Sequence, residues 1–182
     1  GAGIAGLAAA TALAQRGAQV RVIEQAAEIA EVGAGIQISP NGFVVLQALG
    51  LGEDLASVST KGAGVRLRDF RKGSEVFHLA LSRANRPYHF THRADLIALL
   101  LRAAKSAGVT LTLNAHVTHV DRGEGSAKLH LEDGSVEQVG LLIGADGLKS
   151  KARAALAPKS QPFFTGQVAW RAVIPATDPL AA

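Results

Sequence analysis

The first six residues and one later glutamate form a pattern that could bind a dinucleotide. Residues 1–6 read GAGIAG, which fits the motif G-x-G-x-x-G. In this motif the first glycine permits a tight turn, the second lets the backbone approach a pyrophosphate, and the third lets a helix pack closely on a strand. Glu24 follows at about the expected distance of roughly 20 residues. Its carboxylate would accept hydrogen bonds from an adenosine ribose and repel a 2′-phosphate, which favours FAD or NAD over NADP. The alternative is a solvent-exposed glutamate at the end of a strand.

A helix and a strand must position these residues. Small and apolar residues recur at helical spacing over residues 7–15, and Gly17 would end the helix. Residues 20–24, Val-Arg-Val-Ile-Glu, are typical of a short buried strand. With a preceding strand these elements would form a βαβ unit with parallel pairing. Because the sequence contains no Met and begins inside the glycine motif, we expect that strand to precede Gly1 in the natural protein.

The middle of the chain predicts strands that do not belong to this first sheet. Residues 28–42 form a glycine-containing loop, and a helix is predicted over 43–49. Alternating residues at 65–70 and 75–79 flank a turn and predict an antiparallel hairpin of a second sheet. A plain NAD-binding domain would instead continue from Glu24 through a crossover helix to a third parallel strand.

The chain is then expected to return to the first sheet. A helix is predicted over 92–107, followed by a strand over 109–113. Alternation around turn residues predicts a three-stranded meander. Its strands are 117–120, 127–131 and 135–139. Residues 141–143 predict a buried strand before the turn 144–147, and residues 168–174 predict a further strand of the second sheet.

Four segments then occur in an order and at intervals that resemble one enzyme family. They are GAGIAG with Glu24, EVGAGIQISPNG from residue 31, HRADL from residue 92, and GADGLKSKAR from residue 144. Together they resemble class A FAD-dependent aromatic hydroxylases. The segment FTGQVAWRAVIP near the end is similar to the salicylate and 3-hydroxybenzoate hydroxylase branch of these monooxygenases.

The resemblance implies an α/β fold with a specific architecture. It implies a Rossmann-like FAD-binding domain of the glutathione-reductase type with a three-stranded antiparallel meander, interrupted by strands of a second sheet. Residues 1–62 and 92–158 are predicted to form the FAD-binding domain. Residues 63–91 and 159–182 are predicted to form part of a substrate-binding domain.

The resemblance also implies roles for residues outside the glycine motif. Arg93 would lie beside the FAD ribityl and pyrophosphate region, where a guanidinium is a suitable donor. The backbone of Val117 would contact the adenine, and Asp146 would take part in FAD and pyridine-nucleotide binding. The chain has Leu148 and Lys149 where many relatives have Ile and Arg or His, so we assign no contact to Lys149. The alternatives are a surface arginine at the start of a helix and a simple turn at residues 146–147.

Glycines of the second segment would let the backbone approach the cofactor closely. Gln37, just after them, resembles a position near the flavin ring that faces substrate, and an ordinary loop glutamine is the alternative. Gln37 is therefore the candidate for the catalytic site. The predicted cofactor-binding residues are Gly1, Gly3, Ala5, Gly6, Glu24, Gln25, Gly33, Ala34, Gly35, Arg93, Val117, Asp146 and Gly147.

The function implied by the resemblance is FAD-dependent hydroxylation of a small aromatic carboxylate with NAD(P)H and O2. The chemistry would come from the cofactor, while the protein orients the substrate and excludes water. A general base that ionises a phenol is not evident in the sequence. Two alternatives stay open: an NAD-dependent dehydrogenase, and a catalytically incomplete fragment that keeps the FAD fold without turnover.

Composition excludes several other classes. The chain has no Cys, so thiol nucleophiles, disulfides and thiolate metal sites are absent. His116 and His119 would point to opposite faces of a strand without a completing ligand, so no metal site is expected. The net charge is +4, but the basic residues are scattered and do not predict nucleic-acid binding. No apolar run reaches the length of about 20 residues that is needed to cross a bilayer, so we expect no membrane span. We expect a cytoplasmic protein, and the sequence leaves a homodimer open.

Overall fold

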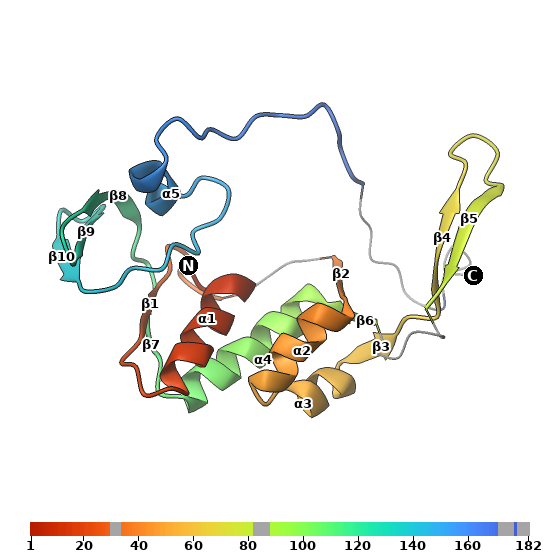
Figure 1. The fold of residues 1–182 in the computed structure, drawn as a ribbon, viewed down its shortest axis with the longest axis horizontal. Helices are drawn as coiled ribbons and strands as arrows, with labels where there is room; N and C mark the ends of the chain where they lie inside the picture. Colours follow the sequence, from red (N-terminus) through yellow and green to blue (C-terminus); the bar gives the residue numbers. More distant parts are fainter. Residues whose placement is uncertain (30–33, 82–87, 171–176, 178–182) are drawn as a thin grey trace. The chain divides into compact units, whose positions relative to one another are not determined.

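The computed structural model describes residues 1–29, 34–81, 88–170 and 177 (Figure 1). The chain is a mixed α/β protein that divides into two compact units. Unit 1 comprises residues 1–30 and 100–170, and unit 2 comprises residues 31–99 and 171–182. The helix α4 (Arg93–Ser106) begins in unit 2 and ends in unit 1. The assignment of residues to an FAD-binding and a substrate-binding domain stays a prediction.

Unit 1 begins with the predicted helix and strand. The helix α1 (Ile4–Ala14) starts immediately after Gly3, and Gly17 takes a φ of 87° just beyond its end, a conformation that suits glycine. The strand β1 (Arg21–Ile23) pairs in parallel with β7 (Thr110–Thr112). This pairing confirms that the chain returns to the first sheet after α4.

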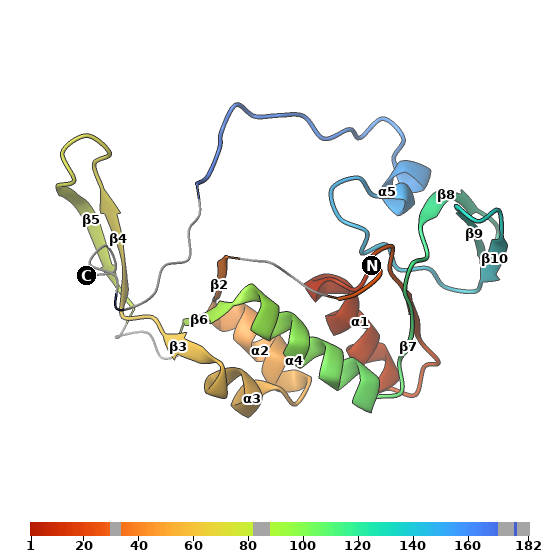
Figure 2. The ribbon, with the colours of Figure 1, turned by 180° about the vertical axis from the view of Figure 1, so that it is seen from behind.

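The predicted meander is also confirmed in unit 1. The strands β8 (Val117–Arg122), β9 (Ala127–Leu131) and β10 (Val136–Val139) form an antiparallel sheet in the order β10-β9-β8. Buried Ala115, Leu129 and Leu131 form its core, which continues onto Ile23 at the end of β1. The short helix α5 (Lys151–Leu156) lies against β8 (Figures 1 and 2).

The prediction of a strand at residues 141–143 is wrong. These residues have no regular secondary structure, and the side chains of Leu141 and Ile143 are 75% and 49% exposed. A strand needs a neighbour that pairs with its backbone N–H and C=O groups, and no strand of the described part of the chain pairs here. Only Leu142 packs against the meander core. Likewise, residues 168–170 form no strand, while residues 171–174 of that prediction lie outside the described residues.

Unit 2 contains a three-stranded antiparallel sheet that the sequence did not predict. Its strands are β2 (Gly35–Ile38), β3 (Ser59–Lys61) and β6 (His89–His92), in the order β2-β6-β3. Residues 35–38 were expected to be loop, because two glycines precede a short apolar stretch. Pairing with β6, distant in the sequence, makes them a strand.

Two helices accompany this sheet. The helix α2 (Pro40–Ala48) begins earlier than predicted, because Pro40 is well suited to the first helical turn. The helix α3 (Gly52–Ser57), which was not predicted, follows after a turn at Gly50 with a φ of 80°.

The predicted hairpin of unit 2 is confirmed. The strands β4 (Gly64–Arg68) and β5 (Glu75–Ala80) pair antiparallel as a two-stranded sheet. The carboxylate of Asp69 accepts hydrogen bonds from the backbone N–H groups of Arg71 (3.1 Å) and Lys72 (2.8 Å), which stabilises the turn. Among the described residues, none belongs to a helix long and apolar enough to cross a bilayer.

Candidate functional site

The three glycines of the motif GAGIAG differ in the space around their Cα atoms. A Cβ on Gly6 would lie 1.8 Å from the carbonyl oxygen of Gly1, and a Cβ on Gly1 would lie 2.7 Å from that of Ala145. A Cβ on Gly3 would meet nothing within 4 Å. Gly1 and Gly6 are therefore required by the packing of the loop itself. Gly3 has free space instead, which is the property expected of the glycine next to a pyrophosphate.

Glu24 contacts this loop directly. Its Oε2 accepts a hydrogen bond of 2.6 Å from the backbone N–H of Ala2, and its Oε1 accepts one of 2.9 Å from Ala26. Burial acts to raise the pKa of Glu24, but the hydrogen bonds from Ala2 and Ala26 outweigh it and hold the pKa below its ordinary value. Glu24 is therefore a carboxylate at neutral pH, placed beside the glycine motif.

Backbone hydrogen bonds beyond the end of β1 join Glu24 to the segment that follows β7. The N–H of Glu24 donates to the carbonyl of Thr112 (2.9 Å), and its own carbonyl accepts from Ala115 (3.0 Å). Val117, the first residue of β8, packs on the same hydrophobic cluster as Ile23, the neighbour of Glu24. The structure thus gathers Glu24, exposed Gln25 and Val117 in one region of unit 1. Ala5 is exposed in the first turn of α1.

Asp146 binds the start of the short helix α5. Its carboxylate accepts hydrogen bonds from the Oγ of Ser150 (2.6 Å) and from the backbone N–H groups of Lys151 (2.7 Å) and Ala152 (3.2 Å). Burial acts to raise its pKa, but these hydrogen bonds prevail and lower it. Gly147 completes the turn with a φ of 72°. In the described structure Asp146 therefore holds the start of α5, and a contact with a cofactor stays a prediction.

We expect Asp146→Ala to lower the free energy of unfolding by about 1–2 kcal/mol, the upper part of the range for lost helix caps. The reason is that two backbone N–H groups at the start of α5 lose their acceptor. Urea unfolding of the purified protein would measure this change, with the neighbouring Lys149→Ala as the matched control. An unchanged unfolding midpoint would contradict this structural role for the carboxylate.

Unit 2 brings together predicted residues from two distant segments. In the register of β2 and β6, Gly35 lies opposite His92 and Gln37 lies opposite Phe90. The backbone N–H of exposed Arg93 donates to the carbonyl of Ala34 (3.4 Å). Ala34, Gly35 and Arg93 therefore share one end of the sheet. Gly33 lies outside the described residues.

Sequence reasoning missed His89, a buried titratable residue of β6. Its Nδ1 lies 2.8 Å from the Oγ of Ser59, and its ring stacks on Phe43 of α2 with 4.7 Å between the ring centroids. Burial, together with the charge of Lys61, lowers its pKa and favours the neutral imidazole. The sequence of His89–His92 gives no local signal for this strand, because the two buried positions are the polar residues His89 and Thr91.

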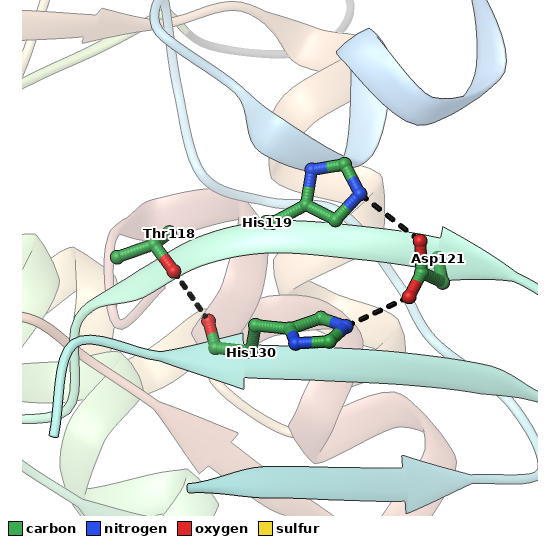
Figure 3. Close-up of polar contacts among 4 residues, drawn as sticks. All are labelled: Thr118, His119, Asp121 and His130. Atoms are coloured by element: carbon green, nitrogen blue, oxygen red, sulfur yellow. Dashed lines mark hydrogen bonds and ion pairs between the residues drawn. The ribbon is translucent and has the colours of Figure 1, made fainter. Parts of the chain in front are cut away.

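The histidines of the meander form two separate groups. Asp121 accepts at Oδ1 from the Nε2 of His119 (3.0 Å) and at Oδ2 from that of His130 (2.7 Å), as Figure 3 shows. These hydrogen bonds, that of His130 first, lower the pKa of Asp121. His116 lies instead beside Glu132, with 3.3 Å from its Nδ1 to Oε2. Among the residues that the structure describes, no group of three or more His, Asp or Glu side chains could hold a metal ion.

The glycine loop, the acidic residue beside it and the parallel pairing of β1 with β7 define a dinucleotide-binding α/β unit. Comparison with known families identifies the dinucleotide. The chain belongs to the FAD binding domain family, whose model matches residues 1–179. This membership selects FAD over the NAD-dependent dehydrogenase alternative.

Several characterised relatives are similar over nearly the whole chain. The 6-hydroxynicotinate 3-monooxygenase of Bordetella bronchiseptica is 37% identical, with 96% of this chain and 46% of that protein covered. The 3-hydroxybenzoate 6-hydroxylase of Polaromonas naphthalenivorans is 38% identical, with 98% of this chain and 46% of that protein covered. The chain thus spans about half the length of the curated relatives it matches.

Solved structures share the fold. The tetrameric form of 2-methyl-3-hydroxypyridine-5-carboxylic acid oxygenase matches with a TM-score of 0.76 and 30% sequence identity. The match covers 86% of this chain and 40% of that one. The sequence-based resemblance to class A flavin-dependent aromatic hydroxylases is confirmed by these relatives.

Proposed function

We propose that this chain forms part of an FAD-dependent monooxygenase that hydroxylates a small aromatic acid using NAD(P)H and O2. The observation that carries the proposal is the carboxylate of Glu24 hydrogen-bonded to the glycine motif at Ala2. This arrangement suits the adenosine end of a dinucleotide, and family membership identifies the dinucleotide as FAD. The substrate class follows from the relatives, whose names specify hydroxybenzoate and hydroxynicotinate.

The architecture of the proposal is a Rossmann-like FAD-binding domain of the glutathione-reductase type. Residues 1–62 and 92–158 would form this domain, and residues 63–91 and 159–182 would belong to the substrate-binding domain. The parallel pairing of β1 with β7 and the antiparallel meander support this proposal. A cytoplasmic location stays a prediction, and the sequence leaves a homodimeric assembly open.

In unit 1, the residues present fit the nucleotide end of FAD. The open space at Gly3 would admit the pyrophosphate to backbone N–H groups at the start of α1. Glu24 would exchange its hydrogen bond with Ala2 for the ribose hydroxyls, and the backbone near Val117 would contact the adenine. FAD supplies the redox chemistry when bound, and the chain positions it.

In unit 2, the end of the sheet at Ala34, Gly35 and Arg93 would contact the cofactor, with the guanidinium of Arg93 facing phosphate. Gln37, exposed on β2, would orient a hydroxyl or carboxylate of the aromatic acid through its amide. The chain would thus hold the polar substituent of the substrate through this amide.

The purified protein is expected to carry flavin that absorbs at about 450 nm. It is expected to oxidise NADH faster when a hydroxybenzoate or hydroxynicotinate is added. Stopped-flow reduction of the flavin, with and without each acid, measures the effect. Benzoate without a hydroxyl group is the matched control. Bound flavin without reduction by NADH or NADPH would instead support a catalytically incomplete FAD fold. Reduction that no aromatic acid alters would contradict the substrate class alone.

A further inference from the structure

The sheet β2-β6-β3 has one buried face and one accessible face. On the buried face, His89 stacks on Phe43, and the Oγ1 of Thr91 donates to the carbonyl of Val58 (2.7 Å). Residues that alternate with these, Phe90 and His92, point to the opposite face. Neither of them is fully buried.

The accessible face carries a row of three side chains in register. Gln37 of β2 and Thr60 of β3 both lie directly opposite Phe90 of β6. Directly opposed residues of antiparallel strands project to the same face, so these side chains are neighbours. Adjacent strands lie about 4.8 Å apart, so the row spans roughly 10 Å, which is the size of one substituted aromatic ring.

Phe90 is held in place by a glycine. A Cβ on Gly62 would lie 2.0 Å from Cε2 and 2.9 Å from Cδ2 of the Phe90 ring. Only a residue without a side chain leaves room for the ring in this position. The N–H of Gly62 also donates to the carbonyl of Tyr88 (2.9 Å), which fixes the glycine to the strand end. The ring therefore packs against the backbone of Gly62, on the face of the sheet that also carries Gln37 and Thr60.

The next row of this face belongs to the predicted cofactor end. Gly35 lies opposite His92, two residues along the strands and so roughly 7 Å from the row of Phe90. Arg93 and Ala34, joined by a backbone hydrogen bond, follow directly. The row Gln37, Phe90 and Thr60 thus lies one step from the residues assigned to FAD. A substrate bound at this row would therefore lie beside the cofactor proposed for that end of the sheet.

We propose that Phe90 is a specificity-determining residue whose ring forms the apolar wall against which the aromatic acid packs. The inference rests on the proposed function and adds a residue that neither the motifs nor Gln37 indicated. An aromatic ring favours offset or edge-to-face packing with another ring. The flanking amide and hydroxyl can hydrogen-bond the polar substituents of that ring.

The test compares variants of Phe90 in the purified flavin-loaded protein. Phe90→Leu is expected to raise KM for hydroxybenzoates and hydroxynicotinate by roughly 10-fold, with a smaller change in kcat, because packing against the ring is lost. Phe90→Tyr, which keeps the ring, is expected to restore KM to within about 3-fold while changing the ratio of kcat/KM between the two acids. Gly62→Ala displaces the ring and is expected to resemble Phe90→Leu.

The controls separate this inference from the function on which it rests. Phe70→Leu, at an exposed phenylalanine of the hairpin turn, is expected to change neither KM nor the ratio. FAD affinity is expected to stay the same in every Phe90 variant. An active wild-type protein with unchanged KM and ratio in Phe90→Leu would overturn the role of Phe90 alone. A wild-type protein that neither binds nor responds to aromatic acids would overturn both proposals.

Discussion

Gly6→Ala is expected to lower both the stability of the protein and its affinity for FAD, whereas Gly3→Ala is expected to lower mainly the affinity for FAD. At Gly6 the new Cβ would lie 1.8 Å from the carbonyl oxygen of Gly1 and 3.4 Å from the Cβ of Ala145. Alanine is favoured over glycine inside a helix by about 1 kcal/mol, but this gain cannot offset a contact that forces the backbone to move. We expect a net loss of about 1–3 kcal/mol in the free energy of unfolding, as for an overpacked core.

Gly3 provides the matched comparison within the same motif. Its backbone is extended, with a φ of −76°, and a Cβ there would meet no atom within 4 Å. The free energy of unfolding of the protein without cofactor should therefore fall by only about 0.5 kcal/mol, the difference between glycine and alanine at a helix N-cap. FAD affinity should fall by roughly 10-fold or more, because the methyl group takes the space of the pyrophosphate.

Thermal unfolding of the protein without cofactor and titration with FAD measure the two effects separately. Equal losses of stability in Gly3→Ala and Gly6→Ala would contradict the packing described for the loop. Undiminished FAD affinity in Gly3→Ala would remove the pyrophosphate from this part of α1 and would leave the membership of the family intact.

Glu24→Ala is expected to weaken FAD binding by roughly 10- to 100-fold, because a charge-assisted hydrogen bond contributes about 1.5–3 kcal/mol. Glu24→Gln should give an intermediate loss, since an amide oxygen still accepts a hydrogen bond but carries no charge. Flavin titration measures both variants. Glu28→Ala, at an exposed glutamate of the same segment, is the matched control. If Glu24→Ala bound FAD as tightly as Glu28→Ala, Glu24 would lie outside the cofactor site.

The lowered pKa of Glu24 predicts a pH dependence with a definite sign. The native protein holds the carboxylate ionised through hydrogen bonds from Ala2 and Ala26. The stabilisation that the ionised Glu24 side chain contributes is therefore fully present above the unfolded-state pKa of about 4.3. It is lost as the pH falls through the lower pKa of the native protein. Urea midpoints measured between pH 3 and 7 on the protein without cofactor should fall less steeply in acid for Glu24→Gln than for wild type. Parallel curves would show that another group governs the acid response.

Much of this protein could be predicted from short stretches of its sequence. The glycine motif with α1, the hairpin around Asp69 and the three-stranded meander all depend on contacts between residues close in the chain. Periodicity and turn residues report such contacts well, because they describe one element and its immediate neighbour. The distance from the motif to Glu24 predicted a carboxylate at an adenosine ribose; the hydrogen bond from Ala2 places Glu24 beside the motif, and its contact with a ribose stays a prediction.

Tertiary structure decided the features that depend on distant partners. Residues 35–38 are a strand because they pair with His89–His92, whereas residues 141–143, although more apolar, are not, because no described strand pairs with them. The same pairing places Phe90 beside Gln37, which no local pattern could reveal. Backbone hydrogen bonds between strands come from segments far apart in the chain, and side-chain periodicity carries no information about which segments meet.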